Sequence, residues 1–249
     1  MKTSNNTILI TGGSAGIGFA FAKALSANNK IIITGRNEAR LKAAAEKLPN
    51  TAAIVSDVAD AKDVEALVAE LNKNHKDLNI VINNAGKSAS PYNLTAEGLD
   101  AFSKASEEIL TNYLAVMRLN EKLLPLLKKQ KEAAIVSVTS IVAIAPGGRL
   151  PGYSASKAAL HSYTITLRQH LANTNVKVFE IYPPLVNTEF SAEIGGAENG
   201  IAPSIVADDL VKGLEADNFD IRVGRTAELY QYYLSNPAQA IAAMSGADA

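Results

Sequence analysis

The chain places a phenol and an ammonium group four residues apart, in the segment Tyr153-Ser154-Ala155-Ser156-Lys157. In a helix this spacing brings both side chains to one face, one turn apart. A free tyrosine has a pKa of about 10, and a fixed positive charge nearby lowers it toward the range useful to a general acid or base. A solvent-facing Tyr/Lys pair has the same spacing, so this segment alone leaves both interpretations open.

Ser140 lies thirteen residues before Tyr153 and two residues after Val138, the last residue of the run Ile135 to Val138. At the end of a strand its hydroxyl can donate to a carbonyl oxygen on which charge builds during hydride transfer. The chain has no cysteine, so it has no thiolate nucleophile and no Cys-ligated metal, and its three histidines show no His-Glu-x-x-His pattern. We therefore predict acid–base chemistry and no metal site.

A glycine-rich turn, Thr11-Gly12-Gly13-Ser14-Ala15-Gly16-Ile17-Gly18, separates the apolar run Ile8 to Ile10 from a helical pattern. Gly12 can take the positive φ of a tight turn, Gly16 lets bare backbone approach a pyrophosphate, and Gly18 lets the helix pack closely. The unpaired N–H groups of the helix N-terminus would then hold a dinucleotide phosphate. Such glycines also occur in ordinary strand-to-helix loops.

Apolar runs and helical patterns alternate along the chain. The predicted strands are Ile8 to Ile10, Ile31 to Thr34, Ala53 to Ser56, Leu78 to Ile82, Ile135 to Val138, Val176 to Ile181 and Phe219 to Val223. The predicted helices after the first are Glu38 to Leu48, Asp63 to Asn74, Leu99 to Lys129, Tyr153 to Ala172 and Ser204 to Ala216. Continuous apolar strands with helical crossovers predict an α/β fold, a Rossmann-like doubly wound parallel sheet with helices on both faces.

The length of 249 residues fits one domain over 1–249, with a substrate loop at about 187–203 and a helical C-terminal tail at about 226–249. A formal net charge of -1 and 47% apolar residues favour neither nucleic acid nor an acidic membrane surface as partner, and leave a small molecule as the expected ligand. The first residues lack the apolar core of a signal peptide, and no run is long enough to span a bilayer. We predict a cytoplasmic protein without membrane insertion.

The segment Thr34-Gly35-Arg36 bears on the choice of cofactor. In dinucleotide-binding folds an acidic side chain at this strand end holds the 2′-hydroxyl of the adenosine, whereas a nearby arginine accepts a 2′-phosphate. Gly35 leaves the acidic position vacant, and Arg36 offers a fork of donors. The segment predicts that NADP(H) is preferred and that NAD(H) can take its place. The alternative is that Arg36 is a solvated charge at a helix entry.

Three motifs together make the chain resemble the short-chain dehydrogenase/reductase superfamily in its compact single-domain form: Thr-Gly-x-x-x-Gly-x-Gly at Thr11 to Gly18, Asn83-Asn84-Ala85-Gly86, and Tyr-x-x-x-Lys at Tyr153. The resemblance spans Ile8 to Thr188. It implies that Tyr153 gives or takes the proton, that Lys157 lowers the Tyr153 pKa and holds the nicotinamide ribose, and that Ser140 polarises the carbonyl.

By the same resemblance Asn112 completes the catalytic tetrad. Its amide lies among apolar helix residues and must find partners, and a bound water leading toward Lys157 would provide one. The alternative is a solvent-facing asparagine. His161 lies one turn beyond Lys157 and is assigned no role, because a lone helix histidine more often packs or faces solvent.

The resemblance also assigns the cofactor contacts. Asp57 and Val58 would contact adenine, with a helix N-cap as the alternative for Asp57, and Asn83 would be the structural asparagine of the fourth strand. Pro184 stands where the family's Pro-Gly-x-Val-x-Thr segment has glycine, so we expect the local backbone to differ. The implied cofactor-binding set is Gly12, Ser14, Gly16, Ile17, Gly18, Arg36, Asp57, Val58, Asn83, Ala85, Gly86, Tyr153, Lys157, Pro183, Val186 and Thr188.

Longer stretches, such as Ile-Thr-Gly-Gly-Ser-Ala-Gly-Ile-Gly and Pro-Pro-Leu-Val-Asn-Thr, resemble the bacterial DltE-type oxidoreductases. The resulting hypothesis is an NADP(H)-dependent oxidoreductase that moves a hydride between nicotinamide C4 and a carbonyl or secondary alcohol. The alternative is a nucleotide-binding regulator or scaffold with the same fold. The helices Leu99 to Lys129 and Tyr153 to Ala172 carry more apolar positions than one sheet face needs, which predicts a homodimer or homotetramer.

Overall fold

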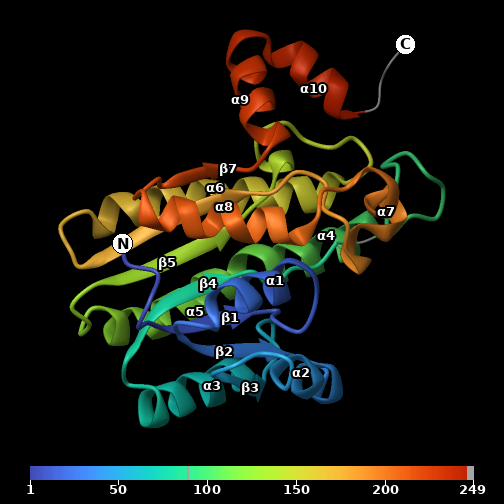
Figure 1. Cartoon of the computed structure of the whole chain (residues 1–249). Helices are drawn as coiled ribbons and strands as arrows, with labels where there is room; N and C mark the ends of the chain where they lie inside the picture. Colours follow the sequence, from blue (N-terminus) through green and yellow to red (C-terminus); the bar gives the residue numbers. More distant parts are fainter. Residues whose placement is uncertain (89, 246–249) are drawn as a thin grey trace.

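A seven-stranded parallel sheet forms the centre of the computed structural model, which describes residues 1–88 and 90–245 (Figure 1). Its strand order is β3-β2-β1-β4-β5-β6-β7, and every neighbouring pair is parallel. The strands are β1 (Thr7–Thr11), β2 (Lys30–Gly35), β3 (Thr51–Val55), β4 (Leu78–Asn83), β5 (Ala133–Val138), β6 (Val176–Tyr182) and β7 (Asp220–Arg222). The predicted Rossmann-like doubly wound α/β fold is confirmed.

Helices cover both faces of the sheet because successive strand residues point to opposite sides. In β1, Ile8 and Ile10 belong to one apolar core and Leu9 to the other. The first core packs beneath α1 (Gly16–Leu25), α2 (Glu38–Ala45) and α8 (Pro203–Glu215). The second packs beneath α3 (Ala61–Asn74), α5 (Ala115–Leu127) and α6 (Pro151–Leu171).

The long helix predicted for Leu99 to Lys129 has an irregular turn in its middle. It consists of α4 (Ala101–Ile109), a π-helical segment η1 (Leu110–Leu114) and α5. Such wide turns shift the register of the side chains that follow and occur frequently at functional sites. Asn112 lies inside this segment and is fully buried.

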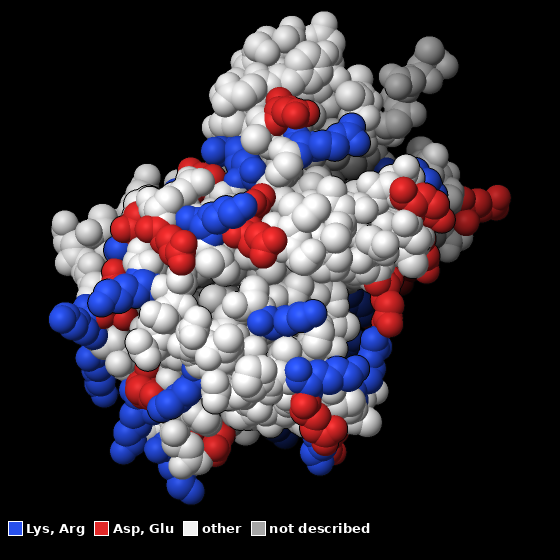
Figure 2. All heavy atoms as spheres, in the orientation of Figure 1, with Lys and Arg blue, Asp and Glu red and all other residues white. Residues whose placement is uncertain are grey.

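The last part of the chain forms two short helices and a projecting helical pair. Residues 187–203, expected as a loop, contain η3 (Glu189–Ile194) and α7 (Gly196–Asn199). The tail forms α9 (Arg225–Ser235) and α10 (Pro237–Ser245), which stand beyond β7 in Figure 1. Pro237 begins the second helix, and the predicted tail residues 246–249 lie outside the described part of the chain. Figure 2 shows charged side chains at the base of this pair and few over the rest of its visible face.

Among the described residues, none of the helices combines the length and the apolar character needed to cross a bilayer.

Candidate active site

Ser140, Tyr153 and Lys157 meet at the carboxyl edge of the sheet, where ligands bind in folds of this kind. Ser140 follows β5 and caps the short helix η2 (Ile141–Ala143), with the Val142 N–H donating to its Oγ at 3.3 Å. Tyr153 lies in the first turn of α6, and the Ser140 hydroxyl lies close enough to its phenol to affect its ionisation. Lys157 follows one turn later, with Nζ 5.6 Å from the centre of the Tyr153 ring. The side chains predicted to act together are thus neighbours.

The Lys157 ammonium is buried, with a side chain only 3% exposed. Its Nζ donates to the carbonyl oxygen of Val138, the last residue of β5, at 2.8 Å. Burial lowers the pKa of Lys157 to about 8, and the carboxylate of Glu180 acts in the opposite direction. The position of this ammonium is therefore fixed by the strand, and its charge is sensitive to its surroundings.

The phenol of Tyr153 has a raised pKa. Burial is the main cause, the negative charge of Glu108 adds to it, and the Ser140 hydroxyl opposes it. This differs from the expected lowering by Lys157, because the loss of hydration of the phenolate outweighs the other effects. The Tyr153 hydroxyl therefore carries its proton at neutral pH.

Asn112 has protein partners on both sides of its amide. Its Oδ1 accepts from the Lys87 N–H at 2.7 Å, and its Nδ2 donates to the Lys87 carbonyl at 2.7 Å and to Ser156 Oγ at 2.8 Å. Ser156 in turn donates to the Tyr153 carbonyl at 2.7 Å. These contacts differ from the expected water, and they exclude the alternative of a solvent-facing side chain. Asn112 joins the loop after β4 to the helix that carries Tyr153 and Lys157.

The glycine-rich turn leaves room for an anion at the start of α1. Gly12 and Gly16 have φ of 67° and 55°. A Cβ added at Gly18 would lie 2.3 Å from the Gly12 carbonyl oxygen, so only glycine fits there. The N-cap of α1 is Ala15, which gives the helix no side-chain cap. Its N–H groups and the bare glycine backbone fit the phosphates of a dinucleotide.

Asn84 fixes this turn to the end of β4. Its Nδ2 donates to the Thr11 carbonyl at 3.0 Å and to the Gly12 carbonyl at 3.2 Å. The Thr11 hydroxyl accepts from the N–H groups of Asn84 and Ala85, both at 3.0 Å. Asn83 points the other way and donates to Asn120 in α5 at 2.9 Å. Asn84 belongs to the motif Asn83-Asn84-Ala85-Gly86, but the sequence gives no sign of this role.

Residues assigned to the adenosine half of the cofactor lie at the ends of β2 and β3. The Asp57 carboxylate accepts from the Ala59 N–H at 2.9 Å, and the N-cap of α3 is Asp60, so the capping alternative for Asp57 does not hold. Arg36 is exposed. A Cβ added at Gly35 would lie 3.7 Å from Ser14 Oγ and 3.5 Å from Leu41. This end of β2 therefore faces the glycine-rich turn.

The segment after β6 closes over the same edge. Val186 is buried and pairs with Ile201 in an isolated parallel bridge. The Thr188 side chain lies 3.2 Å from the position of a Cβ added at Gly16, so it lies against the glycine-rich turn. The half-exposed ring of Phe190 lies 5.8 Å from that of Tyr153, between their centres. The segment after β6 thus reaches Tyr153.

Two buried carboxylates that act on Tyr153 and Lys157 were not predicted from the sequence. Glu108 in α4 is fully buried, and a Cβ added at Gly152 would meet its Oε2 at 2.2 Å. Glu180 in β6 is also fully buried and contacts His161. An acid inside the apolar run of β6 was a visible signal, because a buried charge requires a partner. The burial of Glu108 could not be predicted in this way, since its helix has many polar residues. Among the described residues, no cluster of three or more His, Asp or Glu has the arrangement of a metal site.

Comparisons with known proteins agree with this geometry. The family model described as short chain dehydrogenase matches residues 6–199. The oxidoreductase DltE of Bacillus subtilis (strain 168) is 46% identical over 189 residues, which cover 76% of this chain and 74% of that protein. An NADP-dependent 3-hydroxy acid dehydrogenase of Schizosaccharomyces pombe is 31% identical over 199 residues, 76% of this chain and 75% of that protein.

Solved structures share the fold over nearly the whole chain. A short chain dehydrogenase from Burkholderia cenocepacia J2315 in complex with NADP superimposes with a TM-score of 0.85 at 26% identity, covering 98% of both chains. An enzyme of the same class from Burkholderia phymatum in complex with NAD gives 0.84 at 19% identity, covering 94% of this chain and 96% of that one, and shows the fold alone. The chain therefore belongs to the short-chain dehydrogenase/reductase family of oxidoreductases.

Proposed function

We propose that this chain is an NADP(H)-dependent oxidoreductase that acts on a small carbonyl compound or secondary alcohol, with Tyr153 as general acid and base. The observation that carries the proposal is the convergence of Tyr153, Ser140 and Lys157 at the carboxyl edge of the sheet, beside a glycine-rich turn without a side-chain cap. The proposed unit is one domain over 1–249, with the substrate segment at about 187–203.

The catalytic side chains suit reduction of a carbonyl group. Since the raised pKa keeps the Tyr153 phenol protonated, it can donate to the carbonyl oxygen, and Ser140 can donate to the same oxygen as charge develops. A bound nicotinamide cofactor supplies the hydride. Lys157 is assigned to the ribose hydroxyls, and Asn112 holds the backbone on either side in place. Phe190 packs over Tyr153 and limits access of water to the phenol.

The preference for NADP(H) is supported by the end of β2. Gly35 leaves no carboxylate to repel a 2′-phosphate, Ser14 lies nearby, and Arg36 is exposed and free to meet it. A charge-assisted hydrogen bond contributes about 1.5–3 kcal/mol, or roughly a tenfold to hundredfold preference. Calorimetric titration of NADPH and NADH should give that ratio in the wild type and its reversal in Gly35→Asp/Arg36→Ala. Equal affinities in the wild type would contradict the assignment.

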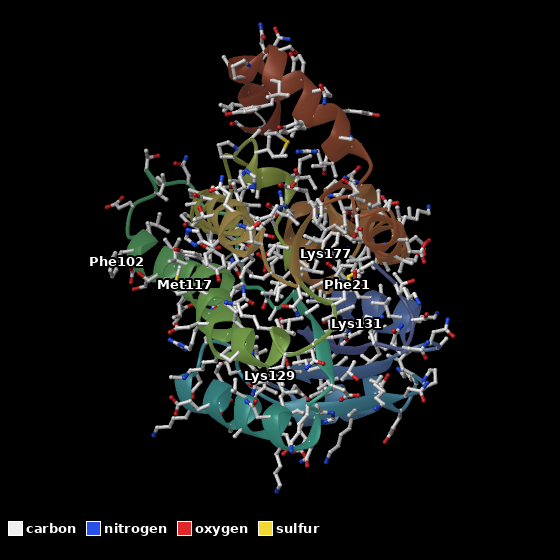
Figure 3. The ribbon with its side chains drawn as sticks, turned by 90° about the vertical axis from the view of Figure 1, so that its left-hand side faces the viewer. Phe21, Phe102, Met117, Lys129, Lys131 and Lys177 are labelled. Carbon is white, nitrogen blue, oxygen red and sulfur yellow. The ribbon has the colours of Figure 1, made fainter. Side chains whose placement is uncertain are left out.

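A homodimer or homotetramer formed through α4, α5 and α6 is part of the proposal. Phe102 on α4 is 82% exposed and lies at the outer edge of the molecule in Figure 3. Leu114 and Ile165 are also exposed, and Tyr113 packs edge-on against Tyr163 between the helices. Such apolar surface is typical of an interface between subunits. A cytoplasmic location stays a prediction.

The proposed reaction is tested by following the loss of NADPH in the presence of aldehydes, ketones and quinones. Tyr153→Phe removes only the titrating hydroxyl, so we expect turnover to fall by orders of magnitude while NADPH affinity changes within a few-fold. Substantial turnover by this variant would contradict the role of Tyr153. If NADPH binds but no compound is reduced, the regulator or scaffold is the better interpretation.

A further inference from the structure

A series of polar side chains descends from the active site along the inner face of α6. Lys157, His161, Thr164 and Arg168 recur at helical spacing, so they lie on one side of the helix. Each contacts the sheet at a different level. The contacts are Lys157 with the Val138 carbonyl, His161 with Glu180, Thr164 with the Ser137 hydroxyl, and Arg168 with the Val178 carbonyl and Asp220.

Two of the sheet groups that contact this series are acidic, Glu180 and Asp220, and Glu180 is the one that acts on Lys157. Along this face of β6, Val178 belongs to the apolar core, and the next inward position is Glu180, with 0% of its surface exposed. In the sheet Glu180 pairs with Ser137, directly before Val138, whose carbonyl holds the ammonium. Glu180 therefore lies one residue along the sheet from Val138, which holds the ammonium, and its partner His161 lies one helical turn from Lys157.

His161 contacts the same carboxylate from the side of the solvent. Its Nδ1 lies 3.0 Å and 3.1 Å from the two oxygens of Glu180, and 31% of its side chain is exposed. The hydrogen bond to Glu180 raises the pKa of His161, so the ring keeps its positive charge to higher pH. A single buried negative charge thus lies between a histidine that exchanges protons with solvent and the lysine of the active site.

The other charges around this pair are already matched. Asp220 in β7 binds Arg168 at 2.9 Å and lies 3.8 Å from Arg222. The hydroxyl of Tyr182 is 3.2 Å from His161 Nδ1, and burial raises its pKa, so it stays neutral and adds no charge. Arg222 also lies over the rings of Tyr182 and, in α9, Tyr230. The Tyr182 hydroxyl also interacts with Glu180, so the cationic groups that share this carboxylate are His161 and Lys157.

We propose that Glu180 is the buried countercharge of Lys157, and that His161 competes with Lys157 for this carboxylate. Both are then positioning residues of the active site, and the inference rests on the proposed function, because it concerns the lysine assigned there to the ribose. A buried ammonium loses its proton easily, and a nearby carboxylate opposes that loss. When His161 is charged it neutralises part of this effect, and when His161 is neutral the whole carboxylate acts on Lys157. Protonation of His161 thereby makes Lys157 lose its proton more readily.

The test follows the ionisation of Lys157 directly, by NMR titration of protein labelled with 13C-lysine. The Lys157 signal is assigned by its loss in Lys157→Met. Glu180→Gln should move the titration midpoint of Lys157 downward by about one pH unit, because the countercharge is gone. His161→Asn keeps an amide donor near Glu180 without the positive charge, so the midpoint should stay or rise. Glu132→Gln, which removes an exposed carboxylate paired with Lys177, is the control and should change nothing.

Two results would overturn the proposal. An unchanged Lys157 midpoint in Glu180→Gln would show that the carboxylate does not act on the ammonium. A fall in His161→Asn as large as in Glu180→Gln would show that any disturbance of the pair loosens the site, regardless of charge. Should Glu180→Gln not fold, the His161 imidazole signal in Lys157→Met decides. Its midpoint should rise once the competing cation is gone, and no change there would also overturn the proposal.

The measurement is independent of the proposed reaction. The Lys157 titration needs neither NADPH nor a substrate, so it remains informative if no compound in the reduction assay is turned over. If the protein does bind NADPH, its affinity should fall as the pH is raised, because Lys157 loses its charge. This fall should begin at a lower pH in Glu180→Gln than in the wild type or in Glu132→Gln. Failure to bind NADPH at any pH would contradict the proposed function and leave the Lys157 titration to decide the role of Glu180.

Discussion

Gly18→Ala is expected to destabilise the protein even though alanine is the better helix former. Gly18 is the third residue of α1, where exchange of glycine for alanine ordinarily stabilises by about 1 kcal/mol. Here the new Cβ would lie 2.3 Å from the Gly12 carbonyl oxygen and 2.5 Å from Asn84 Nδ2, whereas real Cβ contacts start near 3.0 Å. The first obstacle is backbone and cannot rotate away, so the turn or the helix must move.

The cost has two parts. Overpacking of a close contact costs about 1–3 kcal/mol. Displacement of Asn84 removes its hydrogen bonds to the Thr11 and Gly12 carbonyls, each contributing about 0.5–1.5 kcal/mol. After the gain in helix propensity, the free energy of unfolding should fall by about 3 kcal/mol. For a chain of this size that corresponds to a urea midpoint lower by roughly 1 M.

Urea unfolding followed by circular dichroism at one protein concentration measures this change. Gly35→Ala is the matched control, because its Cβ would lie 3.5 Å from the nearest side-chain atom, an ordinary contact. NADPH affinity should also fall in Gly18→Ala, since the Gly12 carbonyl and the Asn84 amide that would be displaced also hold the shape of the glycine-rich turn. A Gly18→Ala protein as stable as the Gly35→Ala protein would refute the close packing of α1 on the turn.

Three further predictions concern the active site and the assembly. Lys157→Ala should weaken NADPH binding and turnover together if one ammonium serves both the ribose and the phenol as proposed, and unchanged binding in calorimetry would count against that double role. Folding lowers the pKa of Lys157 from 10.5 to about 8, so the unfolded chain binds this proton more tightly than the folded chain. As the pH rises between these two values, the free energy of unfolding of the wild type should therefore increase relative to that of Lys157→Met, by up to about 3 kcal/mol in urea titrations. Light scattering should give at least a dimer, and Phe102→Glu should shift it toward the monomer; a concentration-independent wild-type monomer would contradict the interface.

The parts of the structure that could be predicted from the sequence are those with a local signal. All seven strands lie within a few residues of their predicted positions, and the signal is clearest for the central ones, which are the continuous apolar runs of a buried parallel sheet. Gly12 has the predicted positive φ, since the turn needs a conformation that other residues rarely adopt. The neighbourhood of Tyr153 and Lys157 follows from their spacing within one helix.

The features that were missed depend on partners distant in sequence. Asn112 was expected to reach a water, but its partners are the backbone of Lys87 and the hydroxyl of Ser156, which only the folded chain brings together. The π-helical turn that directs Asn112 inward leaves no mark in a pattern of apolar residues. His161 was given no role because a lone histidine on a helix more often packs or faces solvent, and its partner, Glu180, lies nineteen residues away on another element.

The inner face of α6 explains why the Glu180 position breaks the apolar pattern of its strand. The α6 helix buries the Lys157 ammonium at the edge of the sheet, and burying a lone charge is costly. The strand beneath therefore carries a carboxylate where its earlier inward position has Val178. A residue that breaks the local pattern, such as an acid in an apolar strand, is expected where function requires it. In the proposal made above, the acidic residue in β6 therefore serves the lysine of the Tyr-x-x-x-Lys motif on α6.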